Sequence, residues 1–416
     1  MSSRQRVAAI AKLSGWIIVA LLLTHCGTEQ PQSSLPTVRF WHFWSEPAQR
    51  SAIQTIVRQF EQQYQCRVEL SELSWNDGKA KLFAAFNAGT APDVLELGSD
   101  WVAQFSAAGV LADLSDSVDL ARFLPFTHPP ARWEGKTYAV PWVVDTRVLF
   151  LNDSLLQEAG VSAQPPADVD QWYAQSQAVQ QLPDAYGTGV NGADPHRLYK
   201  KVLPFLWSNG GELLDSTGFP TFDRPENIEA VERYVQFAKV GLVETQRRLD
   251  DLFIQGKIGF WISGSWLLDR IPKENPSLRY RLALVPPMPG GESRSFAGGE
   301  YLAIAKSTKQ FRLALQLVRY LTSADVALQF CKLVSSAGFP ADTATFADPY
   351  FATVPGRTVF AQQLRFARMT PVHPQWLEFE RLFEEAVTKV LYGKQTAAEA
   401  LRQAQQQAVQ IAQRRR

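Results

Sequence analysis

Residues 37–73 carry the clearest structural pattern in the chain and read "TVRFWHFWSEPAQRSAIQTIVRQFEQQYQCRVELSEL". Residues 38–43 form an apolar, β-rich run, and residues 67–73 alternate apolar and polar side chains as a strand does. Between them, residues 47–64 show the apolar spacing of a helix, at Ile53, Ile56, Val57 and Phe60. Strand, helix and strand in this order predict a parallel α/β unit with a right-handed crossover.

The alternation of helix and strand patterns continues through the chain. A helix is expected at Lys79–Asn87 and a short buried strand at Val94–Leu97. Further strands are expected at Ile258–Ile262 and Tyr280–Val285, and further helices at Asn227–Lys239, Lys309–Leu321, Trp376–Leu391 and Thr396–Ala412. With 416 residues, 46% of them hydrophobic, the chain has room for two or three domains of α/β class.

The N-terminal residues 1–25 have the layout of a secretory signal. Three basic residues come first, and the apolar run 16–23 that follows is too short to cross a bilayer of about 30 Å as a helix. Residues 22–26, "LLTHC", resemble the lipobox of bacterial lipoproteins, which implies lipidation of Cys26, although His25 departs from the small residue expected there. An unlipidated terminus is the alternative. Residues 26–36 read as a flexible tether.

Charge and reactive residues exclude several functions. Removal of residues 1–25 takes away three basic residues and no acidic one, so the formal charge falls from +1 to −2. Such a chain is a poor partner for nucleic acid. Cys66 and Cys331 form either a disulfide or two buried thiols. The histidines and cysteines show no metal-ligand spacing, so we expect neither a metal nor a cofactor.

Tryptophans gather at the ends of expected strands. Trp41 and Trp44 close the first strand, Trp101 follows the strand at 94–97, and Trp142 and Trp266 follow "TYAVP" and "GFWISGS". In open α/β sheets, ligands bind beyond the carboxyl ends of the strands. Flat aromatic rings with a few nearby carboxylates suit the apolar faces and hydroxyl rim of a sugar, and the carboxylates here are Asp100, Asp145 and Glu300.

Eight segments in the same order resemble the extracellular solute-binding proteins of sugar-type ABC importers: "FWHFWS", "FNAGTAPDVLEL", "FSAAGVLADLSD", "WEGKTYAVPWVVDTRVLFLNDSLLQEAG", "QGKIGFWISGSW", "LALVPPMPGG", "FAGGEYLAIAKSTK" and "SAGFPAD". The resemblance implies the two-lobed periplasmic-binding-protein fold (type II, Venus-flytrap), with discontinuous lobes and a hinge. Lobe 1 would comprise residues 37–145 and 296–342, and lobe 2 residues 146–295 and 343–416.

Together, the strand-end pattern and the resemblance give ten candidate ligand-binding residues: Trp44, Asp77, Asp100, Trp101, Trp142, Asp145, Trp207, Trp266, Gly298 and Glu300. The resemblance favours Asp145 as a hydroxyl acceptor and Trp207 as a cleft-facing aromatic. Each residue also has a packing alternative. Trp44, Trp101 and Trp142 can be core residues, Asp77 can belong to an ordinary turn, and Asp145 can pair with Arg147.

The expected function is therefore capture of a sugar or glycoside and its delivery to a membrane permease by a monomeric, exported protein that a lipid holds at the membrane. A glycerol phosphodiester is an alternative ligand. Its phosphate would prefer an arginine or a helix N-terminus in the cleft, and the arginines to be placed are Arg147, Arg197 and Arg368. Two other classes stay open. Carboxylates among tryptophans also suit a glycosidase, and a surface interaction protein would show no closure around a small molecule.

Overall fold

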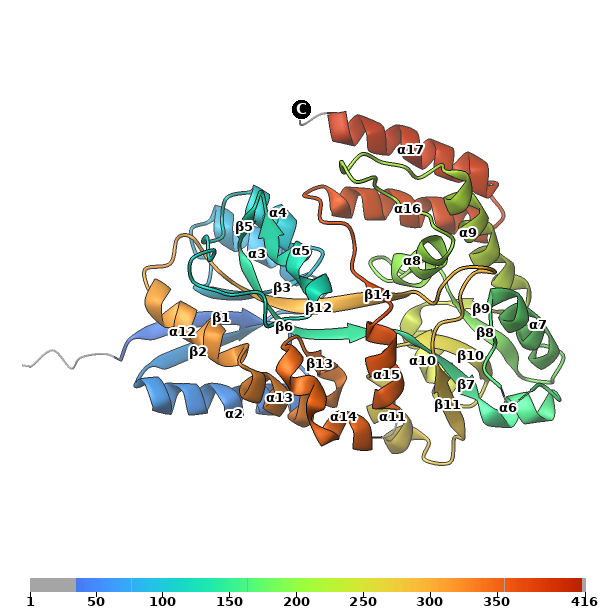
Figure 1. Ribbon diagram of the computed structural model, residues 1–416, viewed down its shortest axis with the longest axis horizontal. Coiled ribbons are helices and arrows are strands. Elements are labelled where there is room, and N and C mark those ends of the chain that lie inside the picture. The colour runs from blue at the N-terminus through green and yellow to red at the C-terminus, as the bar shows by residue number, and fades with distance from the viewer. Residues whose placement is uncertain (1–34, 76, 163, 355, 414–416) are drawn as a thin grey trace, which may run out of the picture. The chain divides into compact units, whose positions relative to one another are not determined.

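The computed structural model describes residues 35–75, 77–162, 164–354 and 356–413 (Figure 1). The predicted signal at 1–25, the lipidation site Cys26 and most of the tether at 26–36 lie outside the described residues, so these predictions stand as made. Within the described ranges, no helix has the length and apolarity needed to cross a membrane.

The first sheet has the strand order β13-β6-β12-β3-β1-β2, and β14 pairs with β12. Its strands are β1 (Thr37–His42), β2 (Arg67–Glu72), β3 (Val94–Gly98), β6 (Ala139–Thr146), β12 (Ser295–Ile304), β13 (Phe339–Pro340) and β14 (Ala367–Arg368). Strand β1 runs parallel to β2 and β3, whereas β12 is antiparallel to β3 and β6. This sheet holds the expected strand-helix-strand unit.

Helix α2 (Pro47–Tyr64) connects β1 to β2 as predicted. Its start is set by a proline in the first turn and by the Gln49 side chain, which accepts a hydrogen bond from the Glu46 N–H at 3.2 Å. It ends where Gln65 takes a left-handed conformation. The helical apolar positions predicted from the sequence are the buried ones, and Ile53 and Phe60 have no exposed surface.

The second sheet has the order β11-β7-β10-β8-β9. Its strands are β7 (Val148–Asn152), β8 (Tyr186–Asn191), β9 (Gly241–Glu244), β10 (Ile258–Ser263) and β11 (Tyr280–Ala283). The β10 and β11 strands confirm the two predictions made for this region, although β11 ends two residues earlier than expected. A separate hairpin is formed by β4 (Arg132–Trp133) and β5 (Lys136–Thr137).

Helices surround both sheets (Figure 1). Besides α2, they are α3 (Gly78–Asn87), α4 (Val102–Ala107), α5 (His128–Ala131), α6 (Asp153–Glu158), α7 (Val169–Val179), α8 (Tyr199–Ser208), α9 (Pro225–Gln236), α10 (Gln246–Ile254), α11 (Leu267–Glu274), α12 (Phe311–Leu321), α13 (Ala324–Leu333), α14 (Pro349–Thr353), α15 (Arg357–Leu364), α16 (Trp376–Leu391) and α17 (Ala397–Gln413). The helices predicted from apolar periodicity are confirmed, with the last turn at 237–239 in 3-10 form.

Two chain segments pass from one sheet to the other and bind each other. Arg147 is the single residue between β6 and β7. The Ser295 hydroxyl donates to the Arg147 carbonyl at 2.7 Å and accepts from the Arg147 N–H at 3.3 Å. The Thr146 hydroxyl donates to the Phe296 carbonyl at 2.9 Å. These bonds tie the end of β6 to the start of β12.

The two cysteines in the described part of the chain are free and buried, which selects the thiol alternative. Burial raises the pKa of both thiols. Loss of a native disulfide would cost about 2–5 kcal/mol, so reductant is a sensitive test. We expect the melting temperature of the domain beginning at Thr37 to be the same with and without dithiothreitol. A fall of several degrees would show that Cys66 and Cys331 are joined.

Candidate ligand-binding site

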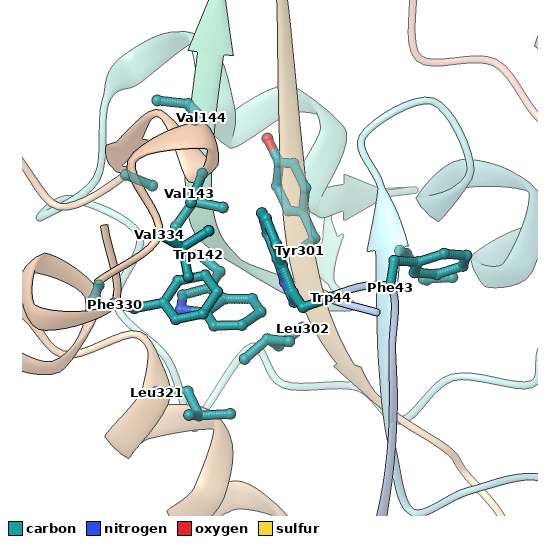
Figure 2. Packing of buried hydrophobic residues seen from close by; sticks show 14 of the residues in the cluster. Phe43, Trp44, Trp142, Val143, Val144, Tyr301, Leu302, Leu321, Phe330 and Val334 are labelled. Atoms are coloured by element: carbon teal, nitrogen blue, oxygen red, sulfur yellow. The ribbon is translucent and has the colours of Figure 1, made fainter. Parts of the chain in front are cut away.

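Trp44 and Trp142 lie in the core beside the first sheet (Figure 2). Trp142 is 1% exposed and stacks on Phe330 at 4.8 Å between ring centroids. Trp44 is 8% exposed and meets the same phenylalanine edge-on at 4.9 Å. The packing alternative therefore describes both, because β6 has neighbours on both edges and α13 covers this face. We do not carry them into the candidate site.

Phe43 points away from Trp44 and Trp142 (Figure 2). It contacts a second set of aromatic rings. Trp75 lies flat on Phe43, with 4.1 Å between centroids and 20° between planes, and its side chain is 42% exposed. Trp101 lies 5.3 Å from Trp75. We call Trp75 and Trp101 the aromatic platform. The Trp75 ring packs on Phe43 with one face, and the exposed remainder of the ring is available to a ligand.

Asp100 lies beside Gly98, and both are close to the aromatic platform. A Cβ atom at Gly98 would stand 2.6 Å from an oxygen of Asp100 and 3.6 Å from the Trp75 ring. Any larger residue at position 98 would thus displace the carboxylate. Asp77, by contrast, is held locally, since its carboxylate accepts from Ser74 at 2.7 Å and pairs with Lys81 at 2.9 Å. These contacts match the turn alternative for Asp77.

A second set of predicted residues meets at the crossing between the sheets. Asp145 pairs with Arg147 at 2.6 Å, and the Arg147 guanidinium lies 4.7 Å from the centre of the Trp266 ring. Gly298 is the β12 residue opposite Asp145, and a Cβ atom there would lie 2.9 Å from the Asp145 carboxylate. The structure thus brings Asp145, Trp266 and Gly298 together through Arg147.

Glu300 lies two residues further along β12 and is partly exposed. Burial raises the pKa of Glu300 well above its usual value, and the charges of Asp145 and Glu96 raise it further. A carboxyl group with a raised pKa holds its proton to a higher pH than usual, and in the protonated form it can donate a hydrogen bond as well as accept one. That is a useful property beside a ligand hydroxyl.

Two glutamates of α16 and a histidine just before α8, none of which the sequence patterns selected, adjoin these sets. His196 pairs with Glu380 at 2.5 Å, and the Glu384 carboxylate accepts from the His196 and Tyr199 N–H groups at 3.0 and 3.1 Å. Burial raises the pKa of Glu384 to about 7, and the charge of Glu380 adds to the effect. Asp100 lies close enough to raise the pKa of His196, after the larger effect of Glu380.

Trp207 and the remaining arginines are already engaged. Trp207 is 5% exposed, and the Arg368 guanidinium lies 5.2 Å from its ring centre. Arg368 pairs with Glu212 at 2.5 Å, and Arg197 pairs with Asp194 at 3.5 Å. Arg147 pairs with Asp145, as described above. Each of the three arginines considered for phosphate recognition therefore has a carboxylate partner.

Two surface hollows have linings without tryptophan. One, of about 550 Å³, is lined by residues 115–120, Arg132, Gly135 and Thr137. The other, of about 410 Å³, is lined by Thr37, Arg39, Glu69, Gly89, Ala91, Asp93 and residues 307–310. Neither contains a predicted site residue or a flat aromatic face, so the candidate site rests on the side-chain sets above.

Trp75 is the main residue that sequence reasoning missed. It follows β2 by three residues, so the strand-end pattern that selected the other tryptophans also applied to it. No sequence pattern selected Lys200 or Lys201, whose side chains lie near aromatic rings. The Lys200 ammonium lies 5.3 Å from the Phe296 ring, and Lys201 is fully buried 5.0 Å from the Trp261 ring.

The fold has two β-sheets with surrounding helices, joined by short crossing segments. Aromatic rings and carboxyl groups at the strand ends are typical of a small-molecule-binding protein. The chain belongs to the bacterial extracellular solute-binding protein family, whose profile matches residues 44–328. The predicted two-lobed α/β fold of the periplasmic binding proteins is thereby confirmed.

Three relatives illustrate the likeness. The diacetylchitobiose binding protein DasA of Streptomyces coelicolor is 26% identical over 64% of each chain. The GacH receptor of Streptomyces glaucescens, whose structure is known without ligand and with acarbose, is 26% identical with a TM-score of 0.79, over 90% of this chain and 97% of that one. UgpB of Mycobacterium tuberculosis, solved with glycerophosphocholine, shares the fold at 20% identity and a TM-score of 0.81, over 92% of this chain and 99% of UgpB.

Proposed function

We propose that this protein is the substrate-binding component of an ABC importer, which captures a sugar or glycoside between its lobes and delivers it to the membrane permease. The observation that carries the proposal is the exposed Trp75 ring, held flat by Phe43 beside Asp100. An indole ring can lie along the C–H face of a pyranose while carboxyl groups bind the hydroxyls. DasA and GacH support this ligand class.

The lobes of the proposal are residues 37–145 with 296–342, and residues 146–295 with 343–416. The crossings described above support this division, because β6 and β7 belong to different sheets and are separated only by Arg147. The ligand would bind one lobe first, and contacts from the second lobe would then stabilise a closed state. We place the aromatic platform and Asp100 on the first lobe and Trp266 on the second.

The paired arginines favour a sugar over a glycerol phosphodiester. Phosphate is bound best by guanidinium groups that can offer two N–H donors at once. Here Arg147, Arg197 and Arg368 each pair with a carboxylate, and binding a phosphate would require those pairs to separate. A neutral sugar requires no such change.

The remaining elements of the proposal carry forward the expectations from the sequence. The protein would act as a monomer outside the cytoplasm, with Cys26 as the lipid anchor, and the transporter's own subunits would hydrolyse ATP. It would bind its ligand without converting it. Incubation with oligosaccharides and analysis of the products tests the last point, since any cleavage would favour the glycosidase alternative.

The first experiment is a thermal-shift screen of the domain from Thr37 against neutral sugars, glycosides, polyols and glycerol phosphodiesters. Free ligand at a hundred times its dissociation constant stabilises the native state by about 2.7 kcal/mol. A saturable shift with a neutral sugar supports the proposal. A shift only with phosphodiesters would replace the ligand class, and no shift with any compound would favour an interaction protein.

Substitution of Trp75 tests the platform directly. We expect Trp75→Ala to weaken sugar binding about tenfold, which corresponds to ~1.4 kcal/mol, because the stacked ring is lost. Isothermal titration calorimetry measures the change. Phe311→Ala is the matched control, since Phe311 on α12 is also a partly exposed aromatic and lies outside the candidate site. Equal affinities for the two variants would remove Trp75 from the site.

A further inference from the structure

The carboxylate of Asp250 on α10 receives three hydrogen bonds while almost entirely buried. One of its oxygens accepts from the Trp261 indole N–H at 2.7 Å and from the Ser263 hydroxyl at 2.8 Å. The other accepts from the Trp266 indole N–H at 2.9 Å. The residue as a whole is 3% exposed. All three partners come from β10 or from the turn that follows it.

Three donors directed at one carboxyl group use acceptor positions on both of its oxygens. Burial raises the pKa of Asp250, and the three donors and the charge of Lys201 only partly oppose this. Lys201 is 1% exposed, and its ammonium has no hydrogen-bond partner among the described residues. Both side-chain oxygens of Asp250 serve as acceptors, so the arrangement is specific for a group with two acceptor oxygens at position 250.

The Trp266 ring is constrained at two further points. The Arg147 guanidinium lies over the ring at 4.7 Å from its centre. On another side, a Cβ atom at Gly264 would stand only 2.0 Å from the ring, far closer than side chains tolerate, so the ring lies directly against the glycine backbone. The indole N–H, one ring face and one ring edge are thus all fixed by neighbours, while the residue stays partly exposed.

We propose that Asp250 is a positioning residue that sets the orientation of the Trp266 ring for ligand stacking, through the Trp266 N–H···Asp250 bond and the close approach at Gly264. This inference rests on the proposed function, in which Trp266 contacts the sugar. Asp250 itself touches no ligand. Its effect on affinity is transmitted only through Trp266.

Two substitutions at adjacent positions provide the test. Asp250→Asn places an NH₂ group against at least one of the N–H or O–H donors, so we expect the sugar found in the screen to bind at least tenfold more weakly. Asp251→Asn is the matched control, because Asp251 points to the partly exposed Arg270 at 2.6 Å. In a Trp266→Phe background, which lacks the indole N–H, Asp250→Asn should cause no further loss. Wild-type affinity for Asp250→Asn, or an equal loss in both backgrounds, would overturn the inference.

Spectroscopy and a second variant keep the inference testable if Asp250→Asn folds poorly or no sugar is found. Gly264→Ala must displace the ring by steric contact, so it should weaken binding as Asp250→Asn does. The near-UV circular dichroism of Asp250→Asn should lose the same band as Trp266→Phe. If wild type binds no sugar, the proposed function fails, whereas the spectra still decide the inference. An unchanged band in both Asp250→Asn and Gly264→Ala overturns it.

Discussion

Glu96→Gln is expected to raise the free energy of unfolding at pH 8 by on the order of 4 kcal/mol and to change it little at pH 4. Glu96 lies on β3 with no exposed surface. One carboxyl oxygen accepts from the Phe43 N–H at 2.9 Å, and the other has no partner among the described residues. Burial raises the pKa of Glu96 to about 8, and the hydrogen bond from Phe43 only partly opposes this.

The direction of the pH dependence follows from the difference between the pKa of Glu96 in the folded protein and in the unfolded chain. The folded protein keeps Glu96 protonated up to about pH 8, whereas the unfolded chain releases this proton above about pH 4.5. The stability contributed by the folded state's proton is therefore full below pH 4.5 and declines as the pH rises to 8. Glutamine has no proton to release, so the variant escapes this decline.

Urea unfolding followed by tryptophan fluorescence at pH 4, 6 and 8 measures the difference. Glu69→Gln is the matched control, because Glu69 lies on the neighbouring strand β2 and is exposed. It should leave the pH dependence as in wild type. A constant difference between Glu96→Gln and wild type at all three pH values would show that Glu96 has the same pKa in the folded and unfolded states.

Trp142→Ala is expected to destabilise the protein by about 4 kcal/mol, because it removes a buried ring and leaves a cavity beside Phe330 and Trp44. The melting temperature should fall by several degrees. Well below that temperature the variant should still bind sugar with wild-type affinity, since Trp142 lies in the core (Figure 2).

The comparison with Trp75→Ala separates packing from binding. Trp75 is 42% exposed, so its removal should affect stability far less than that of Trp142 and affect affinity more. A large affinity loss for Trp142→Ala at a temperature where it is folded would return Trp142 to the ligand site. Calorimetric titration of both variants under the same conditions decides between these results.

Strand and helix positions were predictable because each apolar pattern is local. The ends of β1 and α2 needed only the residues between 37 and 65. Which strand-end tryptophan faces a ligand was not predictable in this way. Trp142 lies within β6 and is buried between β12 and α13. Trp75 follows β2, and its ring has Phe43 on one face and solvent on the other. For Trp142, the segments responsible lie more than 150 residues further along the chain.

The role inferred for Asp250 was out of reach for the same reason. A polar residue in the α10 sequence is compatible with an exposed helix face, and only the fold brings three donors from β10 and the next turn to its carboxylate. Asp145 was predictable in part, because its pairing with Arg147 was one of two alternatives and the pair is present.

Arg147 has two roles, one in the backbone and one in its side chain. It alone spans the step from β6 to β7, and its side chain stacks on Trp266 and binds Asp145. A substitution there alters the joint between the sheets and the ligand side at once. In the proposed function, substitutions that adapt the protein to a new ligand are therefore expected at residues without a role in joining the sheets. Trp75 and Asp100 are the first such positions.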